Sequence, residues 1–135
     1  MSIGVRAGSQ TREIGTPSFL KAFFSTVYVR IEGRNWGSRF PVLMRDLYAG
    51  HVPEDRCAAA LLELADLRQA LAALAPSEVV WDFERSSALP PWGSNISATV
   101  TSLANYFVTS DGRDLLDVLE LAFSAGARAD GVAVE

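Results

Sequence analysis

A regular apolar stripe between Pro53 and Ala75 constrains the fold more than any other feature of the sequence. Its members are separated by four or three residues: Cys57, Leu61, Leu64, Leu67, Leu71 and Leu74. Residues at this spacing share one side of an α-helix. The polar positions between them face solvent: Glu54, Asp55, Glu63, Asp66, Arg68 and Gln69. The pattern predicts a helix that ends before Pro76, because proline cannot continue it.

A second helix is predicted to begin at Thr16 and Pro17. A threonine hydroxyl can cap free main-chain donors, and proline is tolerated in the first turn. One face carries five apolar side chains: Phe19, Leu20, Phe23, Phe24 and Val27. Gly33 stops the helix. The β-branched end of this segment, residues 26–32, is also compatible with a strand.

Two shorter helices complete the helical prediction. One runs from about Pro41 to Tyr48 and is ended by Gly50. The other begins near residue 111, where Asp111 is predicted to cap its start and Asp114 to reach back in a shorter capping box. Its core face holds Leu115, Leu116, Leu119, Ala122 and Phe123. Asp114, Asp117 and Glu120 lie three apart on a face expected to be solvated, with binding of a protein as the alternative.

The remaining periodic segments are typical of strands. Residues 2–8 alternate mildly, residues 11–15 and 105–110 are further extended candidates, and residues 131–135 form a closing strand. In residues 78–84, alternation with period two places Val79, Trp81 and Phe83 on one face, with Val80 and Asp82 on the other. With helices between strands, residues 1–135 are predicted to form a single α+β domain, with a small, mostly antiparallel or mixed sheet and helices packed on one face.

Cysteine content and hydropathy indicate the compartment. Cys57 is the only cysteine, so no internal disulfide can form, and this suits a reducing environment. The first fifteen residues lack the basic and apolar regions of a signal peptide. No apolar stretch approaches the roughly 18 residues that a bilayer needs. We therefore expect a cytoplasmic protein with no membrane partner.

The net charge of -4 hides an asymmetry. Residues 1–53 carry seven basic and three acidic side chains, a net +4, whereas residues 54–135 carry five and thirteen, a net -8. The acidic part argues against direct binding of nucleic acid, which requires clustered lysine and arginine. It is compatible with a basic protein partner, and equally with a role in solubility alone.

Residues for catalysis or metal binding are sparse. His51, the only histidine, is expected in a turn, and Cys57 lies on an apolar stripe that favours packing over nucleophilic reactivity. Asp82 and Glu84 fall on one side of the predicted strand, which suits either acid–base work or, more commonly, a solvated face. No metal motif or phosphate-binding loop is present, so no cofactor is expected.

The three tryptophans differ in their predicted environments. Trp81 alternates with valines and is predicted to be buried. Trp36 and Trp92 each precede a glycine, and Pro90-Pro91 restricts the backbone before Trp92. A tryptophan held in this way either covers a core or anchors a partner. Sequence leaves both interpretations open for Trp36 and Trp92.

Four blocks, taken in order, resemble the Immunity protein 70 family of bacterial polymorphic-toxin systems: NWGSRFPVLMRDLYAG, VVWDFE, PPWGSNIS and NYFVTSDGRDLLDVL. The resemblance extends from about Ile14 to Ala125. It implies an α+β antidote that acts in the cytoplasm without catalysis, binding a cognate toxin and occluding its active surface. An acidic face would suit a basic, nuclease-like toxin.

On this basis the toxin-binding surface is predicted to combine three segments. Trp92 is its anchor, beside the edge formed by Asp82 and Glu84. The 110–114 turn contributes Asp111, Arg113 and Asp114, and a second patch consists of Trp36 and Arg39.

Two rival functions remain open. One is a small enzyme or ligand-binding domain that uses the loops around Trp92 and Asp111 as a pocket, with Arg39, Asp82 and Asp111 as its polar groups. The other is an oligomerising module, which a large apolar patch on one helix face would indicate.

Overall fold

The computed structural model describes residues 2–85, 87–90 and 96–135 of the chain. Its strands are β1 (Ile3–Ala7), β2 (Gln10–Gly15), β3 (His51–Val52) and β4 (Val132–Val134). Its α-helices are α1 (Pro17–Thr26), α2 (Cys57–Ala72) and α3 (Leu115–Gly126). Five short helical segments join them: the π-helical η1 (Val27–Ile31) and η2 (Val42–Leu47), and the 3₁₀-helical η3 (Glu54–Arg56), η4 (Pro76–Glu78) and η5 (Leu103–Asn105).

The four strands form one antiparallel sheet in the order β2-β1-β4-β3. A two-residue turn joins β1 to β2, and Gly8 adopts a φ of 63° there, a conformation that glycine allows without steric cost. Val5, Ala7, Val52 and Val132 are buried on the core face of the sheet. The α+β fold predicted from the sequence is therefore confirmed.

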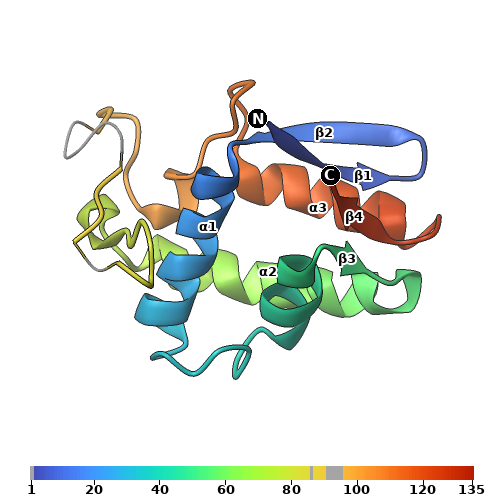
Figure 1. The fold of residues 1–135 in the computed structure, drawn as a ribbon, viewed down its shortest axis with the longest axis horizontal. Coiled ribbons are helices and arrows are strands. Elements are labelled where there is room, and N and C mark those ends of the chain that lie inside the picture. Colours follow the sequence, from blue (N-terminus) through green and yellow to red (C-terminus); the bar gives the residue numbers. More distant parts are fainter. Residues whose placement is uncertain (1, 86, 91–95) are drawn as a thin grey trace.

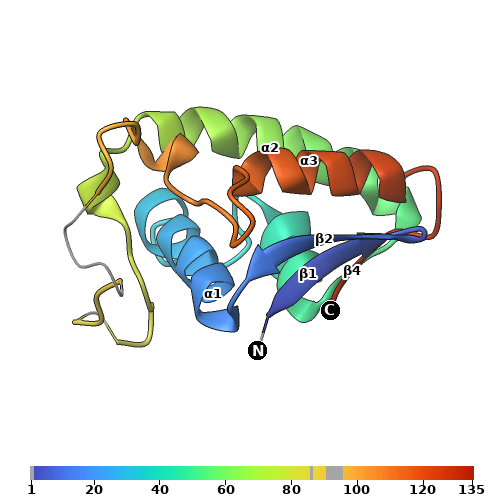
Figure 2. The ribbon, with the colours of Figure 1, turned by 90° about the horizontal axis from the view of Figure 1, so that it is seen from above.

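Helix α3 lies against the sheet, and α2 runs beside α3 in both views (Figures 1 and 2). The stripe predicted for α2 lies in the core at Cys57, Leu64, Leu67 and Leu71. Leu61 and Leu74 are only half-buried, and Ala60 is buried instead. The buried side of α2 therefore includes a small side chain that the predicted stripe did not contain. None of the helices within the described residues is long and apolar enough to cross a bilayer.

The segment after Thr16 is helical through Ile31, so the alternative of a strand over residues 26–32 is wrong. The Thr16 hydroxyl caps the helix by accepting a hydrogen bond from Phe19 N at 3.2 Å. Past Thr26 the helix widens into a π-helical turn, η1, and Gly33, with a φ of 60°, follows its end. The predicted helix near Pro41–Tyr48 is also present, with η2 as its middle part.

The strand predicted over residues 78–84 is absent. Two side-chain hydroxyls of α1 form hydrogen bonds with main-chain groups that would otherwise pair with a neighbouring strand. Thr26 Oγ1 accepts from Val80 N at 3.0 Å, and its single proton has two acceptors within reach, Ala22 O at 2.9 Å and Val80 O at 3.2 Å. Ser25 Oγ accepts from Phe83 N at 3.0 Å. The segment therefore follows α1 as an irregular chain, and Trp81, predicted to be buried, is only half-buried.

Two other local predictions need correction. Residues 105–110 form no strand beyond one isolated bridge between Val108 and Asp114. Phe107 is buried by edge contacts with Phe19 and Phe23. His51, expected in a turn, is the first residue of the two-residue strand β3.

The N-terminal cap of α3 is Asp114, whereas Asp111 was predicted to cap it. The Asp114 carboxylate accepts from Leu116 N at 2.9 Å. Asp111 lies three residues earlier in a turn, where it accepts from the Thr109 hydroxyl. The predicted core face of the helix is confirmed: Leu115, Leu116, Leu119, Ala122 and Phe123 are all buried.

Candidate functional site

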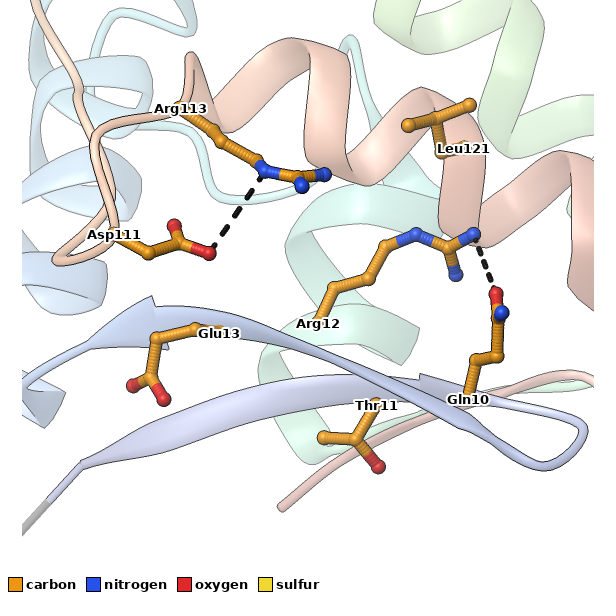
Figure 3. A pocket seen from close by; sticks show the side chains of 7 residues that line it. All are labelled: Gln10, Thr11, Arg12, Glu13, Asp111, Arg113 and Leu121. Carbon is orange, nitrogen blue, oxygen red and sulfur yellow. Dashed lines mark hydrogen bonds and ion pairs between the residues drawn. The ribbon is translucent and has the colours of Figure 1, made fainter.

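A concave surface lies between β2 and α3 (Figure 3). It encloses about 580 Å³ and is lined by Gln10, Thr11, Arg12, Glu13, Asp111, Arg113 and Leu121. We call it the β2–α3 hollow. Two of its residues, Asp111 and Arg113, belong to the predicted binding surface, and strand β2 supplies four.

Arg12 reaches from β2 toward α3 (Figure 3). Its Nη2 donates to Gln10 Oε1 at 3.1 Å, whereas its Nη1 is buried and has no hydrogen-bond partner among the described residues. A buried donor without an acceptor costs free energy, and because this nitrogen is buried, an acceptor from another molecule reaches it only after the side chain shifts. Leu121 on α3 is 49% exposed and adds an apolar side chain to the same hollow.

A hydrogen-bonded turn holds Asp111 and Arg113 at the rim of the hollow. Thr109 N donates to Arg113 O at 2.7 Å, and Arg113 N donates to the Thr109 hydroxyl oxygen at 3.0 Å. Ser110 N donates to Ile14 O at 2.9 Å, which fastens the turn to the end of β2. Within this frame the Arg113 and Asp111 side chains are exposed and only loosely paired, at 3.8 Å.

Asp114 follows this turn directly and has a structural role. It is the cap of α3, and burial is the main cause that raises the pKa of its carboxyl, although the bond from Leu116 N acts in the opposite direction. It is not among the residues that line the hollow. Its contribution to a binding surface would therefore be to fix the turn that carries Asp111 and Arg113.

A second surface consists of four aromatic rings, Tyr28, Trp36, Tyr48 and Phe83, and we call it the aromatic surface. Trp36 is at its centre, with ring centroids 5.0 Å from Tyr28, 4.8 Å from Tyr48 and 5.4 Å from Phe83. The Trp36 indole N–H donates to Met44 O, and the side chain is half-buried. Tyr48 is the most exposed of the four, at 46%.

The buried carboxylate of Glu32 shapes the loop that carries Trp36. It accepts three main-chain hydrogen bonds, each of 3.0 Å, from Gly37 N, Arg39 N and Phe40 N. Glu32 is only 6% exposed. A carboxylate that satisfies three amides in this way replaces regular secondary structure as the support of a loop.

Arg39 projects from the same loop toward α2. Its guanidinium forms a two-pronged pair with Asp66, Nη2 to Oδ1 at 2.8 Å and Nε to Oδ2 at 3.1 Å. The hydrogen bond from Arg39 lowers the pKa of the Asp66 carboxyl. Both side chains are nearly half exposed, so the pair lies on the surface.

Asp82 and Glu84 converge on Lys21 of α1. Lys21 Nζ lies 2.8 Å from Glu84 Oε1 and 3.4 Å from Asp82 Oδ1, and it also stands 5.3 Å from the centre of the Phe83 ring. The pKa of Asp82 is lowered, first by the main-chain bond from Glu84 N and then by Lys21. The hydrogen bond to Glu84 raises the pKa of Lys21. The two acids thus flank a lysine next to the aromatic surface.

A comparison with known protein families assigns the chain. The family model described as Immunity protein 70 matches residues 5–134, a span that begins in β1 and ends in β4. The chain belongs to the Immunity protein 70 family. No curated protein and no solved structure matches it.

The predicted site residues of this family member fall into separate groups. Asp111 and Arg113 lie at the β2–α3 hollow, Asp82 and Glu84 lie beside the aromatic surface that contains Trp36, and Arg39 is paired to α2. Asp82 lines a different hollow of about 230 Å³, together with Val79 and Leu89. The polar set Arg39, Asp82 and Asp111 therefore does not line one common pocket. Trp92 lies outside the described residues.

Sequence reasoning missed Arg12, Thr11 and Leu121 as candidate site residues. Alternation in residues 11–15 puts Arg12 on the same side of the strand as Ile14, and a charged side chain on a core-facing side was the available signal. For Leu121 the signal was its place on the polar side of α3. The importance of Thr11 depends on which edge of the sheet stays open, and that information is not local.

Proposed function

We propose that this chain is the immunity protein of a cognate bacterial toxin, which it binds as a folded partner in the cytoplasm and neutralises by covering the active surface. The observation that carries this proposal is the match of the Immunity protein 70 family to residues 5–134. The antidote performs no chemistry in this proposal. Binding alone can suppress an enzyme completely when the complex is tight compared with the concentrations present.

The contact surface that we propose is centred on the β2–α3 hollow. Its rim presents Asp111 and Arg113 with exposed, loosely paired charged groups, and its interior holds the half-buried Arg12 side chain beside Leu121. Asp114 supports the rim from the start of α3. Concave surfaces that combine an apolar side chain with unsatisfied polar groups are typical of binding sites.

A peripheral contact is proposed around the aromatic surface. Asp82 and Glu84 are acidic and stand next to it, and Trp36 and Arg39 come from the loop held by Glu32. In this area each of these charged side chains already has a partner within the chain. We therefore expect such contacts to affect the rate of association and its salt dependence more than the lifetime of the complex.

The toxin that would suit this chain is basic, as many nucleases are. Residues 54–135 carry a net charge of -8, and an acidic partner accelerates association with a basic one. Raising the ionic strength from about 20 mM to about 150 mM shortens the screening length to about 8 Å and should slow association. A toxin domain with a net negative charge, or an association rate that does not change with salt, would contradict this part of the proposal.

In this proposal the toxin gene lies next to the gene for this chain, and the test is co-expression of this chain with the toxin domain that the neighbouring gene encodes. Cells that express the toxin domain alone should stop growing, and simultaneous expression of this chain should restore growth. A toxin domain with its catalytic residue replaced provides the control for expression burden. Growth arrest that persists although both proteins are soluble and present in equal amounts would reject the proposed function.

A further inference from the structure

Strand β2 is an edge strand with an open side. Gly4 of β1 accepts a hydrogen bond from Glu135 N at 2.9 Å, so the main chain of Gly4, and of Arg6 two residues later, faces β4. The residues opposite them on β2, Glu13 and Thr11, therefore direct their N–H and C=O groups away from β1. This outer side of β2 borders the β2–α3 hollow.

The chain itself occupies only one end of this edge. Ser110 N donates to Ile14 O at 2.9 Å, which is a main-chain contact of the kind that a further strand would make. Within the described residues, no other main-chain group pairs with the outer side of residues 10–13. An open edge beside a cavity is an arrangement that extended peptides use for strand addition.

We propose that an extended segment of the toxin adds to β2 as a fifth strand and lies in the β2–α3 hollow. This inference rests on the proposed function and specifies how the partner binds. The main-chain groups of Thr11 and Glu13 would supply the hydrogen bonds of the new ladder. The segment would be short, because the turn after Gly8 limits it on one side and Ser110 on the other.

The side chains of the hollow define the chemistry of this segment. Two arginines and two acids line the hollow, and Arg113 faces Asp111 at 3.8 Å, so the half-buried guanidinium of Arg12 is the group that a carboxylate on the segment would pair with, after a shift that exposes its unpaired nitrogen. Leu121 is 49% exposed and offers apolar contact to a neighbouring side chain. We therefore expect an acidic and an apolar residue on the face of the segment that points toward α3.

Charge favours the toxin over a second copy of this chain as the occupant. A two-fold antiparallel pairing of β2 with itself, centred on Arg12, would use Thr11 and Glu13 of both copies. It would also set Arg12 directly opposite Arg12 on one face. Like charges in this position destabilise a pair of strands.

Thr11→Pro and Thr11→Val form the decisive pair of variants. Proline removes the outward N–H of Thr11 and obstructs a neighbouring strand, but it is tolerated at edge positions whose N–H faces solvent. Valine keeps the main chain and the branched shape of threonine. The probe is the purified toxin domain encoded beside this chain, and the readout is its dissociation constant by calorimetry. We expect Thr11→Pro to weaken binding at least tenfold and Thr11→Val to change it less than twofold.

Leu121→Asp gives a second test that does not alter the strand, and Leu62→Asp is its control. Leu62 is 76% exposed on α2 and does not line the hollow. The Leu121→Asp substitution should weaken binding at least tenfold, because it removes the apolar contact and repels an acidic segment. Equal binding by the two variants would overturn the assignment of the hollow.

Amide hydrogen exchange covers the case in which Thr11→Pro fails to fold. In the unmodified protein the amides of Thr11 and Glu13 should exchange at least tenfold more slowly once the toxin domain is bound. Full-strength binding by a folded Thr11→Pro, or unchanged exchange at both amides in the complex, would overturn the inference and leave the immunity function intact. Failure of the unmodified protein to bind would instead reject the proposed function. A dimer of the unmodified protein that Thr11→Pro dissociates would identify a second copy as the occupant and also overturn the inference.

Discussion

The aromatic surface and the β2–α3 hollow are opposite kinds of surface on the same small protein. At the aromatic surface the polar groups have partners: Trp36 donates to Met44 O, and Glu32 satisfies three amides of the supporting loop. At the hollow, Arg12 Nη1 has no partner among the described residues, and the outer edge of β2 is open at Thr11.

This difference separates stability from binding. Groups that are satisfied within the chain contribute to folding, and their removal leaves unpaired donors behind. Groups that are unsatisfied gain most from a partner. We therefore expect substitutions at the aromatic surface to lower the free energy of unfolding, and substitutions at the hollow to lower the affinity for the toxin.

The largest effect on stability is expected from Glu32→Ala. The change leaves three main-chain donors, including Phe40 N, without their acceptor, and each unsatisfied buried group costs about 1–3 kcal/mol. The free energy of unfolding should fall by about 3 kcal/mol or more, measured by urea denaturation. Glu32→Gln is the control, because its amide oxygen can still accept and should recover part of the loss. A loss below about 1 kcal/mol for Glu32→Ala would mean that the loop does not depend on this carboxylate.

Trp36→Ala sharpens the comparison because Trp36 was a candidate anchor. The indole is half-buried and packed against three rings, so its removal should cost about 2 kcal/mol of stability. Toxin binding by the folded fraction should change less than threefold. If Trp36→Ala instead kept its stability and lost binding tenfold or more, the aromatic surface would be the principal interface.

The stability that Asp114 contributes as the cap of α3 is expected to depend on pH. Asp114→Ala should cost about 1 kcal/mol, as removal of a side-chain cap commonly does, and Asp114→Asn should cost less because asparagine also caps. Burial raises the pKa of the Asp114 carboxyl in the folded state, so the folded protein binds more protons than the unfolded chain near that pKa. The contribution of this group to stability therefore falls as pH rises from the ordinary aspartate value, about 3.9, through the folded value. As pH rises across this window, urea unfolding should show the free energy of unfolding of Asp114→Asn increasing relative to that of the unmodified protein. A difference between the two proteins that does not change with pH would contradict this prediction.

The smallest effect is expected from Arg39→Ala. Its pair with Asp66 is exposed, and pairs of this kind contribute little to folding. The midpoint of thermal unfolding should not change measurably at physiological salt. A modest loss in the association rate with the toxin, larger at low salt, would assign Arg39 to the peripheral contact. A clear drop in the unfolding midpoint would show that the Arg39–Asp66 pair stabilises the fold.

How far the sequence predicts this molecule depends on whether the relevant forces are local. Helices α2 and α3 and the 17–31 helix are predicted in their positions, because apolar spacing identifies most of the side that is buried, although Ala60 of α2 is buried where Leu61 was expected. Residues 78–84 alternate like a strand, yet their amides bond to the hydroxyls of Ser25 and Thr26, more than fifty residues away. The role of Glu32 likewise depends on a loop that folds back over it.

The candidate site shows the same division. Asp111 and Arg113 could be named from a polar turn with glycine, and the structure places both at the hollow. Arg12 had a local signal, a charge on the core-facing side of a strand, but Thr11 could not be chosen in advance, because its importance follows from the strand order β2-β1-β4-β3, which leaves β2 at the edge. Strand order is set by contacts between distant segments, and no local pattern encodes it.

The most direct test of the central claim is a titration of the catalytic activity of the toxin domain with this protein. Binding to a covering surface predicts that activity falls in proportion to the protein added, reaches its minimum at one equivalent, and returns when the complex is dissociated. Activity that persists at tenfold excess would contradict the immunity function. Irreversible loss of activity with far less than one equivalent would show that the protein modifies its target by catalysis, which would contradict neutralisation by binding.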